Sequence, residues 1–428
     1  MISQINPMTI QKINKYLIAA SVFLIPFYFF RFSVLGIKTN VFEIAILLSF
    51  LSFIVFLTKE KKKIIYGPVW PYLFLIIALI SAYFSSDKTT ALGIFKGWFF
   101  VPIVFYWLII NNFKQKELYK LNIALFASLI IVSFWAILQR FGIIGTLFYQ
   151  SGDVTFLQYI ADKRVFGPFE SPNFLAMFIV PVAFLSLPLL FEAKAENFSL
   201  CSKNILVKIF ALVSFSLPIT ALYFSGSKGG LWAFIIGMLV YLNYTYINKQ
   251  KSKDRRPVLA TLIVTCLFIG NYLYFYVISH LANLSGSNES RKEIYKHSIQ
   301  LLKNNFINGV GLGGFNDAIA QVSVNDSYFK YFILPYALHP HNLLLAIWLN
   351  LGILGLLLFV VILIDFLKNA FSSDLKIKAT ILAAIMAIMV HGLFDTTYFK
   401  NDLSAIFWLI FAFSIIIGNK NETKEINN

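Results

Sequence analysis

Residues 343–364, LLLAIWLNLGILGLLLFVVILI, contain no charged side chain. About 20 consecutive apolar residues are enough for a helix to cross the hydrocarbon core of a bilayer. Backbone groups left unpaired in lipid cost several kcal/mol, so such a run should be helical. Similar runs recur along the chain, and we expect about twelve membrane-spanning helices, near residues 16–36, 41–57, 69–85, 94–110, 121–139, 173–191, 205–224, 229–247, 258–279, 342–367, 377–397 and 402–418.

The composition supports this assignment. The 428 residues are 58% hydrophobic and 13% charged, whereas soluble domains carry about 25% charged residues. The net charge of +16 fits the basic cytoplasmic loops of a membrane protein, because a nucleic-acid-binding protein would need a basic face on a soluble domain. Cys201 and Cys266 fall in a charged loop and an apolar run, which predicts neither a disulfide nor a zinc site. We expect an all-α polytopic membrane protein with a single domain, residues 1–428.

Lysine and arginine predict the orientation. Dense clusters such as Lys61–Lys63 and Lys249–Arg256 fall in alternate short loops, which the positive-inside rule places in the cytoplasm. Both termini are then cytoplasmic, and the first apolar run is kept as a span because it is too long for a signal-peptide core. Segments 140–172 and 280–341 become outer, periplasmic loops, and loops of that length are usually functional or disordered.

The second outer loop is expected to contain a helix. Ser290 and Glu293 have the spacing of a capping box, and apolar residues follow at Ile294, Ile299, Leu301 and Leu302. We expect this helix to begin near Ser290, to lie along the membrane surface and to cover a cavity. Arg291 would stand at its first position, where free backbone amides and a guanidinium together suit a phosphate.

Two further cations, Arg164 and Lys228, stand at predicted span ends. Arg164 begins RVFGP (164–168), and Lys228 lies within SGSKGG (225–230). Each side chain either binds an anion or extends towards lipid headgroups, and the sequence favours neither. The stretch Asn308–Phe315 is either a nest of amides for phosphate or a turn that packs closely on a helix, which we favour.

Histidines form another group. His339, His341 and Asn342 stand at the start of the span near 342–367, and an ordinary histidine pKa near 6.5 suits a general base on a hydroxyl. The alternative is an interfacial histidine with a structural role. Two histidines one residue apart can also begin a metal site, but no third ligand stands at a recognisable spacing, so we predict no metal.

His391 and Asp395 are four residues apart, so we expect them on one face of the same helix. Ionisable groups at membrane depth are candidates for function, and a structural hydrogen bond between them is an equal alternative. No two aspartates are adjacent or one residue apart, although metal-dependent sugar-nucleotide transferases commonly use such a pair.

Taken in order, these pieces resemble the O-antigen ligase and O-antigen polymerase superfamily. The order, the spacing and the long loop before the histidines agree over roughly residues 160–400. The first five spans match only as generic membrane helices. The matching segments are Arg164–Asn173, Ser227–Gly229, Arg291 through Asn308–Phe315, His341–Leu343 leading into Asn350–Gly355, and His391–Asp395.

The resemblance implies an enzyme of the bacterial inner membrane with its active site on the periplasmic face. It would move a glycan from undecaprenyl diphosphate to an acceptor hydroxyl, with inversion and without a metal or other cofactor. Arg291 and Lys228 would bind the diphosphate, and His341 would activate the acceptor. Ligases typically carry arginine at position 228, and lysine keeps the charge but loses the bidentate geometry. The other substrate-binding candidates are Arg164, His339, Asn342 and Asp395.

The sequence leaves other functions open. Ligation to lipid A–core is slightly favoured over polymerisation of lipid-linked repeat units. A transporter of lipid-linked glycans is a different class, but transporters place charges near the bilayer midplane and often show inverted repeats. Here the informative charges gather at one face and no repeat is visible. A non-catalytic scaffold would tolerate the loss of Arg291 and His341.

Overall fold

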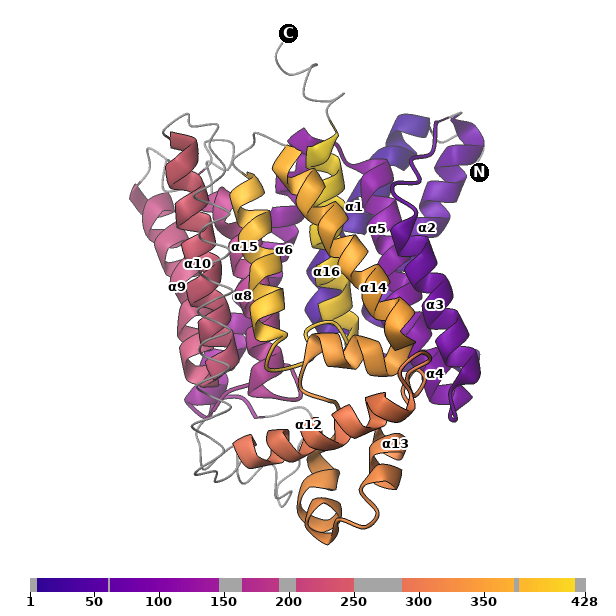
Figure 1. Cartoon of the computed structure of the whole chain (residues 1–428). Coiled ribbons are helices and arrows are strands. Elements are labelled where there is room, and N and C mark those ends of the chain that lie inside the picture. The colour runs from indigo at the N-terminus through magenta and orange to yellow at the C-terminus, as the bar shows by residue number, and fades with distance from the viewer. Residues whose placement is uncertain are drawn as a thin grey trace.

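The computed structural model describes residues 6–60, 62–145, 164–191, 205–249, 287–372 and 377–419. They form a bundle of upright helices, and α1 begins and α16 ends at the same end of it (Figure 1). The helices are α1 (Pro7–Leu24), α2 (Val41–Lys59), α3 (Trp70–Phe84), α4 (Lys88–Ile94), α5 (Val101–Asn112), α6 (Leu118–Arg140), α8 (Pro172–Phe191), α9 (Ile205–Ser225), α10 (Lys228–Lys249), α12 (Ser287–Asn304), α13 (Phe315–Val322), α14 (Leu343–Ser372), α15 (Ile377–His391) and α16 (Asn401–Gly418).

Shorter elements join these helices. The π-helical turn η3 (Phe95–Phe100) connects α4 to α5, and a second π-helical turn, η6 (Phe329–Ile333), follows α13. Single 3-10 turns lie at Ile25–Phe27, Gln115–Glu117 and Leu334–Tyr336. An antiparallel hairpin is formed by β1 (Arg31–Val34) and β2 (Ile37–Asn40), with Phe32 opposite Thr39.

The all-α membrane class is confirmed in its coarse form. Within the described parts of the chain, six helical stretches are long and apolar enough to cross a membrane: Val41–Lys59, Lys88–Asn112, Gln115–Arg140, Pro172–Leu190, Leu343–Phe371 and Asn401–Gly418. Trp70–Phe84, Ala211–Ser225 and Ile377–His391 are shorter apolar helices. The predicted span 258–279 lies outside the described residues, and the total of twelve stays a prediction.

Two of the predicted spans had wrong boundaries. The first span was expected over 16–36, but α1 begins at Pro7 and ends at Leu24. Pro26 follows in a 3-10 turn, where a proline cannot donate the next helical hydrogen bond. The chain then enters the β1–β2 hairpin, whose turn places Leu35 and Gly36 at positive φ. The span predicted to reach 397 ends as α15 at His391.

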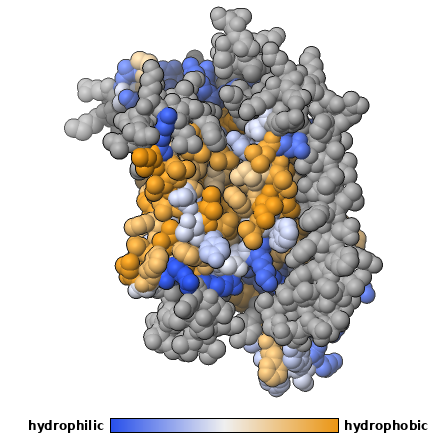
Figure 2. Space-filling model, turned by 90° about the vertical axis from the view of Figure 1, so that its left-hand side faces the viewer, coloured by the Kyte–Doolittle hydropathy of each residue, from blue (hydrophilic) through white to orange (hydrophobic). Residues whose placement is uncertain are grey.

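The outer surface of the bundle is apolar. Figure 2 shows a hydrophobic band across the middle of the side that carries α9 and α10 in Figure 1, with hydrophilic residues towards both ends. Leu212 of α9 is 64% exposed, and Leu239 of α10 is 51% exposed. A soluble monomer rarely exposes a large contiguous apolar surface, so this band is the surface that lipid would cover.

The interior is packed with aromatic side chains around α16. Trp408 of α16 is fully buried and its indole N–H donates a hydrogen bond to the Tyr398 hydroxyl, 3.0 Å away. The Tyr398 hydroxyl donates in turn to the backbone oxygen of Trp98, at 3.0 Å. Because buried polar atoms are costly when unpaired, this chain of hydrogen bonds fixes the loop before α16 against η3.

A crosswise layer, made of α12, α13 and the first turns of α14, covers one end of the bundle (Figure 1). The α14 helix changes direction at Gly352, which has φ 71° and ψ −179°. The glycine-rich stretch packs on this kink: Val310 N donates to Leu349 O at 2.7 Å, and Ile353 N donates to Ile307 O at 3.1 Å. Gly313 N donates to the Asn350 side chain at 3.1 Å. These contacts support the close-packing interpretation of Asn308–Phe315 rather than the phosphate nest.

Replacing Gly352 with alanine is expected to destabilise the protein by about 2 kcal/mol or more, since residues forced into such backbone conformations cost about 1–3 kcal/mol. A Cβ at this position would also lie 2.0 Å from Ile307 O. The thermal midpoint of the purified protein in detergent measures the effect. Gly93→Ala is the matched control, because a Cβ at Gly93 meets nothing within 4 Å. Equal midpoints for the two variants would contradict the steric argument.

Candidate functional site

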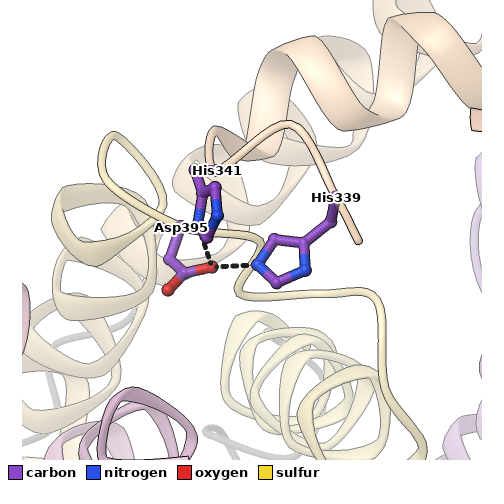
Figure 3. A group of neighbouring side chains, drawn as sticks. All are labelled: His339, His341 and Asp395. Carbon is purple, nitrogen blue, oxygen red and sulfur yellow. Dashed lines mark hydrogen bonds and ion pairs between the residues drawn. The ribbon is translucent and has the colours of Figure 1, made fainter. Parts of the chain in front are cut away.

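A cluster of ionisable side chains lies where the segment before α14 meets the α15–α16 connection. His339 Nε2 is 2.8 Å from Asp395 Oδ1, and His341 Nδ1 is 3.5 Å from the same oxygen (Figure 3). The two imidazole rings are 4.2 Å apart, measured between centroids. The Asp395 side chain is only 4% exposed, while those of His339 and His341 are 25% and 18% exposed. A buried carboxylate therefore holds two partly accessible imidazoles.

Asp395 has further hydrogen-bond donors. Asn173 Nδ2 donates to Oδ2 at 3.1 Å, and the backbone N–H of Thr396 donates to Oδ1 at 2.9 Å. The Asn173 amide oxygen accepts from the Ser227 hydroxyl at 3.0 Å. Through these contacts, the starts of α8 and α10 are tied to the same carboxylate.

The electrostatics suit a carboxylate beside a neutral base. Burial by itself raises the pKa of Asp395. The charges and hydrogen bonds of His339 and His341 have a larger opposite effect, so this pKa lies well below its usual value. Burial lowers the pKa of His341, as does the charge of His339, and the contact with Asp395 only partly opposes the decrease. At neutral pH, Asp395 is therefore ionised and His341 is neutral, the state in which an imidazole can accept a proton.

Backbone contacts fix the position of His341. It has φ 49°, a left-handed conformation that is uncommon for residues other than glycine and that clusters at functional sites. Tyr295 of α12 donates its hydroxyl proton to His341 O at 2.8 Å. The next residues anchor α14, since Leu343 N donates to Gly392 O at 2.6 Å.

Asn342 is used structurally. Its side-chain oxygen accepts from Leu345 N at 3.0 Å, and its Nδ2 donates to Leu393 O at 3.3 Å. The first contact caps the start of α14, and the second ties it to the α15–α16 connection. The Asn342 side chain thus contacts the backbone of the protein itself. A direct role of Asn342 in substrate binding stays a prediction.

The first residue of helix α12 differs from the predicted one. It begins at Ser287 rather than near Ser290, so Arg291 lies in the second turn and not at the first position. The argument from free amides at the helix start therefore does not apply to Arg291. Its charge nevertheless reaches the site, because it contributes to lowering the pKa of His341. Arg291 and Tyr295 are four residues apart and share the helix face that meets His341.

Arg164 and Lys228 occupy different positions. Arg164 donates from Nε to Ser225 O at 2.8 Å, where a cation at the C-terminal end of α9 is favoured by the helix dipole. Lys228 is the exposed first residue of α10. Its neighbour Gly229 packs so closely on His391 that an added Cβ would lie 2.8 Å from a ring carbon. Lys228 therefore lies beside the buried part of the site, but its role in binding is a prediction.

The structure changes the interpretation of Asp395. His391 and Asp395 were expected on one helix face, but α15 ends at His391 and Asp395 follows in a turn. The Asp395 backbone N–H donates to His391 O at 3.1 Å, whereas its carboxylate contacts His339. No third metal ligand stands at a recognisable spacing in the sequence, and the structure brings Asp395 beside the two histidines. Sequence spacing could not reveal this contact, because His339 and Asp395 are 56 residues apart.

The site has the donor set for a metal. His339, His341 and Asp395 each offer one ligand atom, and these atoms lie within 4.8 Å of one another; two histidines and a carboxylate are a known metal-binding combination. Metal independence therefore stays a prediction to be tested directly. A second group, Glu293, His297 and Asp326, meets the same distance limit. There Lys296 Nζ lies 3.0 Å from Glu293 and 3.8 Å from Asp326, so a lysine already supplies positive charge.

An ion pair supports the site from the side of α8. Lys400, which precedes α16, donates a hydrogen bond to Glu170, and its Nζ lies 3.8 Å from the centre of the Phe174 ring. Burial opposes ionisation of Glu170, but Lys400 and the Tyr28 hydroxyl lower its pKa below the usual value. No sequence pattern predicts this pair or the contact of Tyr295, because nothing in their spacing links these residues to the histidines.

Comparison with known proteins finds one family model that matches part of the chain. Residues 213–360 match the family model described as O-antigen ligase, and this range includes Lys228, Arg291, His339 and His341. No curated protein matches the sequence. The match covers about a third of the chain, and Asp395 completes the site from outside it. The family match and the ordered motifs therefore support a relationship between this chain and the O-antigen ligase and polymerase superfamily.

Proposed function

We propose that this protein is a membrane glycosyltransferase that moves a glycan from undecaprenyl diphosphate to an acceptor hydroxyl on the periplasmic face. The observation that carries the proposal is the triad of His339, His341 and Asp395 beneath the Arg291–Tyr295 face of α12. It lies at the end of the bundle that the charge pattern assigns to the periplasm. The family match supports ligase or polymerase chemistry in general.

The residues account for each part of the transfer. The acceptor oxygen attacks the anomeric carbon, the bond from that carbon to the diphosphate oxygen breaks, and the configuration inverts. His341 takes the hydroxyl proton, and Asp395 stabilises the resulting imidazolium. The negative charge that develops on the departing diphosphate is stabilised by Arg291, with Lys228 as a second cation. No step needs a metal ion.

Ligation to lipid A–core is the favoured reaction, and polymerisation is the alternative. The test supplies detergent-purified protein with an undecaprenyl-diphosphate glycan and, in parallel, lipid A–core or a second lipid-linked unit. EDTA is present throughout, and products are separated on a gel. Transfer to lipid A–core indicates a ligase, and a ladder on the lipid-linked unit indicates a polymerase. If well-folded protein transfers to neither acceptor, either with EDTA or with added divalent ions, the proposal fails and lipid flipping in liposomes becomes the next assay.

Arg291→Ala is expected to lower the transfer rate by about 10²- to 10³-fold, since removing one group that stabilises transition-state charge has an effect of that size. Lys303→Ala is the matched control, because Lys303 is an exposed cation in the last turn of the same helix. Its transfer rate should stay close to that of the parent protein. A similar loss in both variants would show that net charge on α12, rather than Arg291 itself, is responsible.

EDTA tests the metal directly. We expect the transfer rate to be unchanged after extended dialysis against EDTA, since fixed cations neutralise the leaving group in the proposed reaction. Loss of transfer that is restored by one divalent ion would instead assign His339, His341 and Asp395 as its ligands. A matched comparison is the His339→Ala variant, which should lose any metal-dependent activity together with the ion.

A further inference from the structure

An open cavity of about 760 Å³ lies between α3, α12, α13 and the kinked part of α14. Its floor is the backbone of the glycine-rich stretch, including Gly309 and Gly311, which packs on the α14 kink. In Figure 1 these four helices meet at the end of the bundle that the crosswise layer covers. The cavity lies outside the cluster formed by His339, His341 and Asp395, and none of these three residues lines it.

One wall of the cavity continues the lipid-facing surface. Ile77, Ile80 and Phe84 of α3 contribute to it, as does Leu354 of α14. Ile80 is 51% exposed, Phe84 is 76% exposed and Leu354 is 60% exposed. Exposed apolar side chains on membrane-spanning helices are those that acyl or prenyl chains would contact. A ligand of this cavity therefore has access to the bilayer along α3 and α14.

The opposite wall is polar and carries amide groups. Asn304 and Asn308 come from the end of α12 and the residues after it, and Gln321 comes from α13 beside Asp317. Among the residues that the structure describes, these four side chains form no hydrogen bond with another protein group. Carboxamides both donate and accept, and a carboxylate accepts, so the wall offers both kinds of partner to hydroxyl groups.

The charge of the lining separates this cavity from the reaction centre. Within the parts of the chain that the structure describes, no lysine or arginine lines the cavity, and Asp317 is its one charged residue. A diphosphate would gain no cation here and would face a carboxylate. The lining instead suits uncharged, hydroxyl-rich groups that are attached to a lipid.

The distance along α12 between the reaction centre and the cavity indicates which part of a substrate the cavity could bind. Arg291 and Asn304 are separated by 13 residues of the same helix, which corresponds to about 20 Å at the rise of an α-helix. The reacting bond lies at Arg291 in the proposed mechanism. The cavity is therefore suited to a substrate portion that is remote from the reacting atoms.

We propose that this cavity binds uncharged sugars of the acceptor glycolipid, with the lipid part lying against α3 and α14. The identity of the ligand as acceptor rests on the proposed transferase function, because the donor diphosphate needs the cationic site at Arg291. Asn304, Asn308 and Gln321 donate and accept hydrogen bonds with sugar hydroxyls, and Asp317 accepts from them. These residues determine acceptor affinity and take no part in proton transfer.

Photolabelling tests sugar binding without any need for catalysis. The full-length protein in lipid nanodiscs is exposed to an alkyl maltoside that carries a photoreactive diazirine in its chain, and labelled peptides are identified by mass spectrometry. We expect label on α3, α14 or residues 304–322, with displacement by unlabelled alkyl maltoside but not by an alkyl phosphocholine of equal chain length. Equal displacement by both would indicate a purely apolar surface and would overturn the proposal.

Matched variants test whether the side chains of the polar wall contact the bound sugar. The double substitution Asn304→Ala with Gln321→Ala is expected to lower maltoside labelling about tenfold, as the loss of two ordinary hydrogen bonds implies. Asn325→Ala is the control, because Asn325 is an exposed residue after α13 that does not line the cavity. Undiminished labelling in the folded double variant would overturn the assignment of these two residues.

The transfer assay tests the acceptor role. The double variant is expected to show a KM for the acceptor raised about tenfold, with kcat and the KM for the donor unchanged. A change in the donor KM instead would overturn the acceptor assignment. If the parent protein shows no transfer at all, the proposed function fails, whereas the photolabelling result still decides whether the cavity binds sugars.

Discussion

Replacing His341 with alanine should lower the rate of glycan transfer by about 10²- to 10⁴-fold, the usual contribution of a positioned general base. His341 is held between Asp395 and the Tyr295 hydroxyl, and its low pKa keeps it neutral. The KM for the donor should change little, because the imidazole acts on the acceptor hydroxyl. Initial rates at saturating donor and acceptor, measured with the purified protein, give the loss in kcat.

A second variant separates the imidazole from the backbone. His341 has φ 49°, and alanine is strained there, whereas asparagine tolerates left-handed conformations better. His341→Asn therefore keeps the backbone closer to its native conformation and lacks the base. We expect it to lose as much activity as His341→Ala while keeping the thermal midpoint of the parent protein. Near-normal transfer by folded His341→Asn protein would remove His341 from the proposed mechanism.

Replacing Asp395 with asparagine should lower kcat by about 10²-fold or more, because an uncharged amide no longer stabilises the imidazolium that forms on His341. The pH profile should shift as well. A base works only when it is neutral, so activity is present above the pKa of His341 and is lost as the pH falls through it. Asp395 raises that pKa, so its neutralisation moves the acidic limb of the profile to lower pH.

The measurement is kcat against pH for the parent protein and the Asp395→Asn variant, with folding checked by size-exclusion chromatography. In the parent, the acidic limb should lie below pH 6.5, the usual histidine value, because burial lowers the pKa of His341. An acidic limb that moves to higher pH in the variant would mean that another group titrates. Asn173→Ala is an informative comparison, since it removes one donor to Asp395 but leaves the carboxylate.

The sequence could identify His339 and His341 as candidate site residues, but it could not identify the carboxylate that they contact. His339 and His341 stood out because histidine is rare in this chain and both precede a long apolar run. The sequence spacing pairs Asp395, their shared partner, with His391 instead. The helix period predicts that contact only if the helix continues, and α15 ends at His391.

The start of α12 illustrates a different limit. Ser290 and Glu293 have the spacing of a capping box, yet the helix begins nearly one turn earlier, at Ser287. Local spacing identifies a helix more reliably than its first residue, because helix ends depend on a few competing hydrogen bonds. The three-residue difference removed Arg291 from the helix start but left it on the face that meets His341.

The sequence alone indicated the membrane class, many of the apolar helices and the resemblance to the O-antigen ligase family, since long apolar runs and ordered motifs are local properties of the chain. Only the tertiary structure decided which of those motifs meet. The contact between His339 and Asp395 joins residues 56 positions apart, and Tyr295 reaches His341 across 46 positions. Such contacts depend on how helices pack and where each one ends, which no local pattern specifies. The cavity beside the α14 kink has the same origin, because it exists only where four separate helices come together.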